Sequence, residues 1–185
     1  ALIADAAILY LEGYLWDPEE PRAAMRAAIE VARKAGRKVA FTLSDTFCIS
    51  RHGDDFRRLI ADGLIDILFA NENELAALAE VEAFEDAVAK VSPQVPTLVV
   101  TRGEHGACAI QHGTRAEVPA EPIAAVVDTT GAGDLFAAGF LHGQAQGKGL
   151  EASLTMGALC AAEIISHFGA RPQVDLKQLI ADKLR

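Results

Sequence analysis

The chain has 185 residues, of which 51% are hydrophobic and 23% are charged, a composition typical of a globular domain. Its 17 Lys and Arg against 26 Asp and Glu give a formal net charge of −9, which argues against nucleic acid or anionic lipid as a partner. No apolar run reaches the length needed to cross a bilayer, so no membrane is expected. The three cysteines are far apart and form no metal-binding pattern, which indicates a reducing, cytoplasmic location.

Strands and helices alternate along the first hundred residues. Short apolar runs predict strands over 8–11, 38–43, 65–69 and 97–101. Apolar residues at helical spacing predict helices over 22–35, 54–61, 72–78 and 84–91. This order is typical of a mostly parallel sheet covered by helices, and the strands are apolar enough for burial on both faces.

The pattern changes after residue 107. A His112-Gly113 turn between runs 107–111 and 115–118 predicts a hairpin, and residues 126–127 predict a short strand. Three helices are expected to close the chain, over 131–146, 150–166 and 175–184. With no repeat, low-complexity tract or linker, residues 1–185 are interpreted as one domain.

Three polar or glycine-rich segments follow predicted strands, at 71–74, 101–106 and 128–134. Ligands of parallel α/β sheets bind at such places, beyond the carboxyl ends of strands. In the third segment Gly131 and Gly133 let the backbone approach a ligand closely, at the start of a helix whose free N–H groups favour an anion. Asp134, in the same first turn, would stay ionised and able to accept a proton. A glycine turn with an ordinary helix-start carboxylate is the simpler alternative.

The string Asp-Thr-Thr-Gly-Ala-Gly-Asp over 128–134 matches the D-T-x-G-A-G-D signature of the ribokinase-like (PfkB) carbohydrate kinases at every defined position. Residues 71–74 match the N-x-x-E motif of that family, residues 101–106 its T-x-G-x-x-G motif, and 169–172 resemble its G-A-x-P motif. All of these occur in the order of the family. The resemblance implies a ribokinase-like three-layer α/β/α fold with a mostly parallel central sheet.

The resemblance also implies roles for the glycine-rich string. Asp134 would be the catalytic base on the substrate hydroxyl, and the backbone amides of Gly131, Ala132 and Gly133 would form an anion hole for a phosphoryl group of ATP. Asp128 and the Thr130 carbonyl would be candidates for a monovalent-cation site, with K⁺ as the ion. The helix around Ala158, rich in small residues, would line the adenine pocket.

The other two motifs would act on the nucleotide phosphates. Asn71 and Glu74 would order Mg²⁺ through water, in keeping with the preference of this ion for oxygen ligands and retained waters. Thr101 and Gly103 would contact phosphate, and Gly106 would permit the turn. The five histidines share no ligand spacing and are interpreted as scattered residues rather than a metal site.

Segments 10–18, 43–48 and 69–72 look most like bacterial family members labelled adenosine kinase or sugar kinase. A nucleoside, adenosine first, is therefore the expected phosphate acceptor, with a sugar of the ribose or fructose type as the alternative. A nucleotide-binding module without turnover is a third hypothesis. Family members carry further N-terminal strands and a β lid, often used for homodimers, ahead of this region. Both are absent here, so the chain resembles the C-terminal nucleotide-binding and catalytic portion of a kinase and is expected to be poorly active alone.

Overall fold

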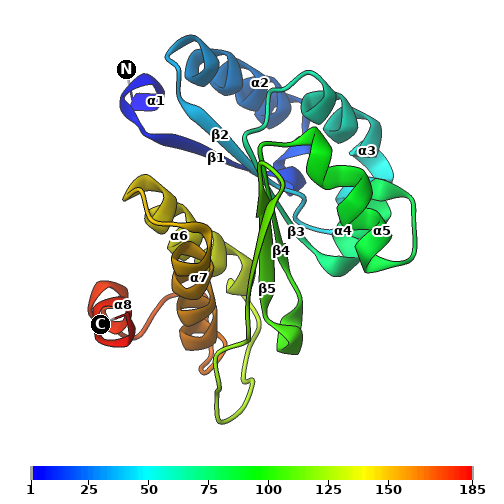
Figure 1. Ribbon diagram of the computed structural model, residues 1–185. Coiled ribbons are helices and arrows are strands. Elements are labelled where there is room, and N and C mark those ends of the chain that lie inside the picture. The colour runs from blue at the N-terminus through cyan, green and yellow to red at the C-terminus, as the bar shows by residue number, and fades with distance from the viewer. Residues whose placement is uncertain (1, 185) are drawn as a thin grey trace. The chain divides into compact units, whose positions relative to one another are not determined.

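The computed structural model describes residues 2–184, and neighbouring strands pair in chain order from β1 to β6 (Figure 1). The strands are β1 (Ile8–Glu12), β2 (Lys38–Thr42), β3 (Ile67–Asn71), β4 (Thr97–Thr101), β5 (Ala107–Gln111) and β6 (Thr114–Val118). The α-helices are α1 (Leu2–Asp5), α2 (Glu19–Lys34), α3 (Thr46–Ala61), α4 (Glu72–Ala79), α5 (Phe84–Val91), α6 (Ala132–Ala145), α7 (Leu150–Ile164) and α8 (Leu176–Lys183). Short 3₁₀ helices are η1 (Gly13–Trp16), η2 (Ser92–Gln94) and η3 (Gly103–His105). The predicted alternation of strands and helices is confirmed.

The chain forms two compact units. The first contains residues 2–100 and 110–115, and the second contains residues 101–109 and 116–184. The motif at 71–74 therefore belongs to the first unit, whereas the segments at 101–106 and 128–134 belong to the second.

In the first unit, strands β1, β2 and β3 pair in parallel, with Leu9 opposite Val39 and Phe41 opposite Leu68. Successive residues of β2 are buried, as a strand covered on both faces requires. Helices α2 to α5 lie on one side of these strands (Figure 1). Helix α2 buries Met25 and Ile29, whose spacing of four residues gives it one apolar face.

Helix α3 starts at Thr46, eight residues before the predicted start at Asp54. The side chain of Asp45 accepts a hydrogen bond from the Cys48 amide at 2.6 Å and thereby caps the helix, a signal that the sequence analysis missed. Phe56 of α3 packs edge-on against Phe41 at 5.0 Å between ring centroids. Tertiary packing therefore stabilises the part of α3 around Gly53 that the glycine would weaken.

The predicted hairpin is confirmed, with β5 and β6 joined at His112 and Gly113. Both residues have positive φ, 48° and 80°, as the type I′ turn of a tight hairpin requires. The predicted strand at 126–127 is wrong: Val126 is 60% exposed, and the Val127 amide donates to the Ile165 carbonyl rather than to a neighbouring strand. A two-residue apolar run was too short to distinguish a strand from a loop.

In the second unit, α6 and α7 pack with their backbones close together. A Cβ atom built on Gly139 would lie 2.5 Å from the Met156 carbonyl oxygen, and one on Gly143 would lie 2.6 Å from Ser153 Oγ. Only glycine allows this approach, which fixes α6 against α7. Within residues 2–184, no helix is both long and apolar enough to cross a bilayer.

Candidate functional site

The first turn of α6 is an open helix N-terminus. Gly131 precedes it with φ of 82°, and no side chain caps the helix. The Ala132 amide donates to the Thr129 carbonyl at 3.1 Å, so its proton is already engaged. Among the described residues, the amides of Gly131, Gly133 and Asp134 have no main-chain acceptor. Free amides at the positive end of a 14-residue helix are suited to an anion.

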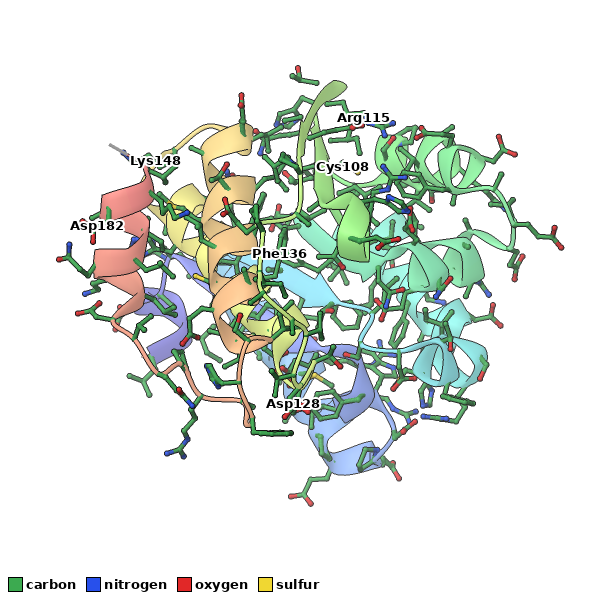
Figure 2. The ribbon with its side chains drawn as sticks, turned by 90° about the horizontal axis from the view of Figure 1, so that it is seen from below. Cys108, Arg115, Asp128, Phe136, Lys148 and Asp182 are labelled. Carbon is green, nitrogen blue, oxygen red and sulfur yellow. The ribbon has the colours of Figure 1, made fainter. Side chains whose placement is uncertain are left out.

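The side chain of Asp128 is occupied by the turn that leads into this helix. One carboxylate oxygen accepts from the Thr130 amide at 2.9 Å and from the Thr130 hydroxyl at 2.7 Å. The other accepts from the Gly169 amide at 3.0 Å, which places Asp128 beside the segment that follows α7 (Figure 2). The Thr130 hydroxyl is the main cause that lowers the pKa of Asp128, because it hydrogen-bonds to the charged form.

The T-x-G-x-x-G segment turns the chain between β4 and β5. Thr101 ends β4, and Gly103 follows with φ of 55°. Gly106 has φ of 83°, and a Cβ atom there would collide with the Val118 carbonyl oxygen. Glycine at 106 is therefore required by the local backbone, whatever ligand the segment meets.

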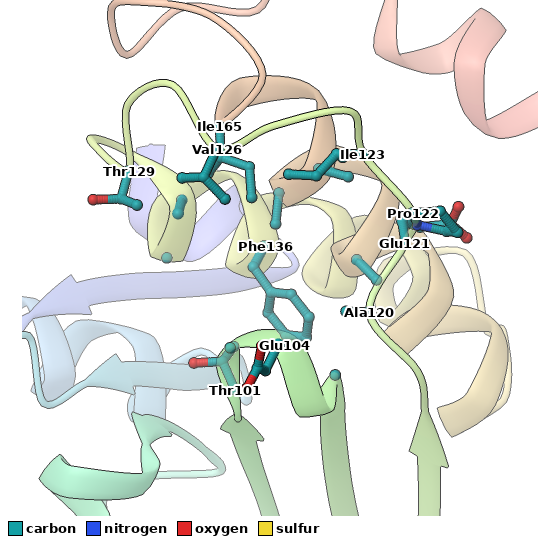
Figure 3. Close-up of a pocket in the computed structure, with 17 residues that line it drawn as sticks. Thr101, Glu104, Ala120, Glu121, Pro122, Ile123, Val126, Thr129, Phe136 and Ile165 are labelled. Atoms are coloured by element: carbon teal, nitrogen blue, oxygen red, sulfur yellow. The ribbon is translucent and has the colours of Figure 1, made fainter.

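A cavity of about 490 Å³ lies within the second unit (Figure 3). Phe136 stands in the middle of it, with Thr101 and Glu104 on one side and Val126 and Ile165 on the other. The lining is mostly apolar, with carboxylates only from Glu104 and a second glutamate at 121, as suits a flat, uncharged ring system. The predicted site residues that line this cavity are Thr101, Gly103, Gly106, Ala132, Gly133 and Ala158.

Helix packing shapes this cavity. A Cβ atom on Gly157 would lie 2.8 Å from the Phe136 carbonyl oxygen, so glycine lets α7 approach α6 there.

Phe136 and the 120–126 segment line the cavity, although the sequence motifs did not predict this. Phe136 could have been found, since it lies four residues after Ala132 and three after Gly133, on the same helix face. The 120–126 segment has no regular pattern that would reveal it.

The Asn71-x-x-Glu74 motif, in the first unit, forms the N-terminus of α4. The Asn71 side-chain oxygen accepts from the Glu74 amide at 2.9 Å, and the Glu74 carboxylate accepts from the Asn71 amide at 3.0 Å. The Asn71 side-chain nitrogen also donates to Glu74, at 2.6 Å. This is a complete capping box. Burial raises the pKa of Glu74, whereas the hydrogen bond from the Asn71 amide acts in the opposite direction; a nearby cation would further favour the charged form.

The described residues contain no group of three His, Cys, Asp or Glu side chains arranged to hold a metal ion. Of the other predicted residues, Asp128, Thr130, Gly131 and Asp134 lie in the same unit as the cavity but do not line it. Asp134 is exposed at the start of α6. The site of the second unit is therefore an apolar cavity continuing, through Ala132 and Gly133, to an uncapped helix N-terminus.

The sequence profile of the pfkB family of carbohydrate kinases matches residues 1–176, and the chain belongs to this family. Two solved structures, adenosine kinase from Sinorhizobium meliloti and a probable sugar kinase from Rhizobium etli, are each 40% identical with a TM-score of 0.96. Each match covers 98% of this chain, and 56% and 55% of those proteins respectively. The cytidine kinase of Thermococcus kodakarensis is 34% identical over 143 residues, 74% of this chain and 50% of that protein. The chain thus spans about half the length of these relatives, and the expected ribokinase-like fold is confirmed.

Proposed function

We propose that this chain carries the nucleotide-binding and catalytic part of an ATP-dependent kinase that phosphorylates a hydroxymethyl group, with adenosine as the first-choice acceptor. The observation that carries the proposal is the apolar cavity continuing to the open N-terminus of α6. An adenine ring fits such a cavity, and phosphates fit the free amides of Gly131, Gly133 and Asp134.

In this proposal Asp134 is the general base. Its carboxylate accepts the proton of the acceptor hydroxyl while that oxygen bonds to the γ-phosphorus. The bond from the γ-phosphorus to the bridging oxygen breaks, and ADP leaves. The amides of Gly131 and Gly133 stabilise the negative charge on the transferred phosphoryl oxygens, because they are already oriented before the reaction.

Asn71 and Glu74 are proposed to order Mg²⁺ through water molecules. Both side chains are engaged with each other, so retained water would have to bridge them to the ion. Mg²⁺ would supply positive charge for the nucleotide phosphates. Asp128 and the Thr130 carbonyl are proposed to hold a monovalent cation such as K⁺. Asp128 Oδ2 accepts one hydrogen bond, from the Gly169 amide, so this oxygen keeps a lone pair for a cation.

The relatives support a small acceptor with a primary hydroxyl. Two of the three relatives compared bear the names of nucleoside kinases, which is why adenosine is placed first. The probable sugar kinase from Rhizobium etli is equally similar, which makes a ribose- or fructose-type sugar the second candidate. The three cysteines are buried and form no disulfide among the described residues, which suits a protein that works in the reducing cytoplasm.

The test is ATP consumption by the intact protein with adenosine, cytidine, ribose or fructose, each at equal concentration. We expect turnover with adenosine well above every other acceptor. Fastest turnover with a sugar would replace adenosine by the second candidate. No turnover above the Asp134→Asn background with any acceptor, despite ATP binding, would favour a nucleotide-binding module and contradict the proposed kinase.

A further inference from the structure

Glu163, in the last turn of α7, has a carboxylate in which only one of the two oxygens accepts hydrogen bonds. Its side chain is only 9% exposed. One oxygen accepts from the Gln173 amide at 2.8 Å and lies 3.1 Å from His167 Nε2. The other oxygen is buried and has no hydrogen-bond partner among the described residues. Leaving a buried carboxylate oxygen unpaired is unfavourable, so a stabilising role alone explains this residue poorly.

Both partners of Glu163 lie on the segment that follows α7, residues 166–173. His167 Nδ1 also lies 3.2 Å from the Phe168 carbonyl oxygen, so both nitrogens of the imidazole ring face acceptors. The segment has no regular secondary structure, and Phe168 is 80% exposed. The Glu163 side chain therefore contacts the segment near both of its ends, while the Ser166 hydroxyl bonds to the Ala162 carbonyl of α7 at the start of the segment.

The middle of the 166–173 segment touches the turn that leads into α6. The Gly169 amide donates to Asp128 at 3.0 Å. Ala170 packs on Gly131, where a Cβ atom would lie 3.2 Å from the Ala170 Cβ. Contacts thus run without a break from Glu163, through the segment, to the glycine from which the open helix N-terminus starts.

We propose that Glu163 is a positioning residue for phosphoryl transfer: by fixing residues 166–173 it holds Asp128 and Gly131, and with them the free amides at the start of α6. This inference rests on the proposed function. Glu163 does not touch the cavity or the reacting groups, so its effect reaches them only through the segment. A small displacement of groups that orient a transition state slows the chemical step more than it weakens ligand binding.

The test compares variants of the intact protein by steady-state kinetics. In Glu163→Ala we expect kcat to fall about tenfold, while KM for ATP stays within about twofold. Glu163→Gln keeps an oxygen that can accept from the Gln173 amide and should recover most of kcat. Should the alanine variant not fold, His167→Ala removes one of the same two partners and should lower kcat about threefold, again without raising KM.

Ser153→Ala is the matched control on the same helix. Ser153 is fully buried and its hydroxyl bonds to the Gly149 carbonyl and to Gln144, but nothing connects it to the 166–173 segment in the described contacts. We expect a lower melting temperature and an unchanged kcat. Amide exchange supplies a second readout, because Glu163→Ala should speed exchange at Gly169 and Gln173 and Ser153→Ala should not.

The outcomes separate this inference from the proposed function. A kcat of Glu163→Ala equal to that of Ser153→Ala, with Asp134→Asn inactive, overturns the positioning role and leaves the kinase intact. A rise in KM for ATP at constant kcat also overturns it, because Glu163 would then act on binding. If the wild-type protein shows no turnover with any acceptor, the proposed function fails. Unchanged amide exchange at Gly169 in Glu163→Ala would overturn the positioning role separately, because this measurement does not depend on turnover.

Discussion

Two helices of this protein begin at motifs of the pfkB family, and the two beginnings differ. At α4, Asn71 and Glu74 bond to each other and to each other's amides, so this N-terminus is closed by its own side chains. At α6, no side chain caps the helix, and the amides of Gly133 and Asp134 have no main-chain acceptor among the described residues. A closed N-terminus stabilises the fold, whereas an open one keeps its binding capacity for a ligand.

The difference has a simple origin in the sequence. Asparagine followed three residues later by glutamate is a capping box, in which both side chains reach back to the backbone. Glycine at 131 and 133 has no side chain with which to do so. The motif at α6 therefore gives up the stability that a side-chain cap would add, about a few tenths of a kcal/mol where glycine stands at the N-cap, and keeps its amides free.

The largest expected effect on turnover is at the open N-terminus of α6. Asp134→Asn removes the proposed base but keeps the size of the side chain, and should lower kcat by about 10²- to 10⁴-fold. ATP affinity, measured by calorimetry, should stay nearly unchanged because the amides are intact. The melting temperature should change little, since Asp134 is exposed. Equal turnover in variant and wild type would remove Asp134 from the mechanism.

Gly106→Ala should have the largest effect on folding. The new methyl group would meet the Val118 carbonyl oxygen in a left-handed backbone conformation, so a loss of about 2 to 4 kcal/mol in the free energy of unfolding is expected. Gly147→Ala is the control, because Gly147 has φ of 69° but open space around it. It should lose only about 1 kcal/mol. Denaturant unfolding measures both, and equal losses would show that the close approach to Val118 is unimportant.

Asn71→Ala tests the closed N-terminus of α4. In contrast to Asp134→Asn, this substitution is expected to lower stability. Loss of the cap should lower the free energy of unfolding by about 1 kcal/mol. If Asn71 also orders Mg²⁺, turnover at limiting Mg²⁺ should fall about tenfold and recover in excess Mg²⁺. A titration of activity against Mg²⁺ separates the two roles. Loss of stability with an unchanged Mg²⁺ requirement would restrict Asn71 to capping.

The smallest effect concerns an ion pair at the surface. Arg51 and His52 hydrogen-bond to Asp17 and lower its pKa to about 2 from an ordinary 3.8. The folded state is thus favoured by ionised Asp17 above pH 3.8, and this contribution is lost as the pH falls from 3.8 towards 2. Asp17→Asn should therefore be slightly less stable than wild type at pH 5 and equal to it near pH 2. Since the pair is exposed, salt should reduce the difference, and a difference that persists at pH 2 would contradict this account.

The local backbone of the motifs is readable from the sequence because glycine, asparagine and aspartate act on the residues next to them. The capping box at Asn71 and Glu74 was also readable from spacing alone, although it was interpreted only as a metal-ordering pair. The start of α3 was misplaced because a histidine, a glycine and two aspartates, residues 52–55, interrupt its helical pattern. The cavity around Phe136 and the contacts of Glu163 depend on tertiary packing between α6, α7 and loops, which no local pattern encodes.

The most direct test of the central claim follows the backbone amides by NMR during titration of the intact protein with ATP and Mg²⁺. The amides of Gly131, Gly133 and Asp134 should shift strongly and become protected from exchange as phosphate binds. The Ala132 amide, already bonded to the Thr129 carbonyl, should change less. Saturation of the protein with ATP while the first three amides stay unchanged would contradict the role of the open N-terminus of α6.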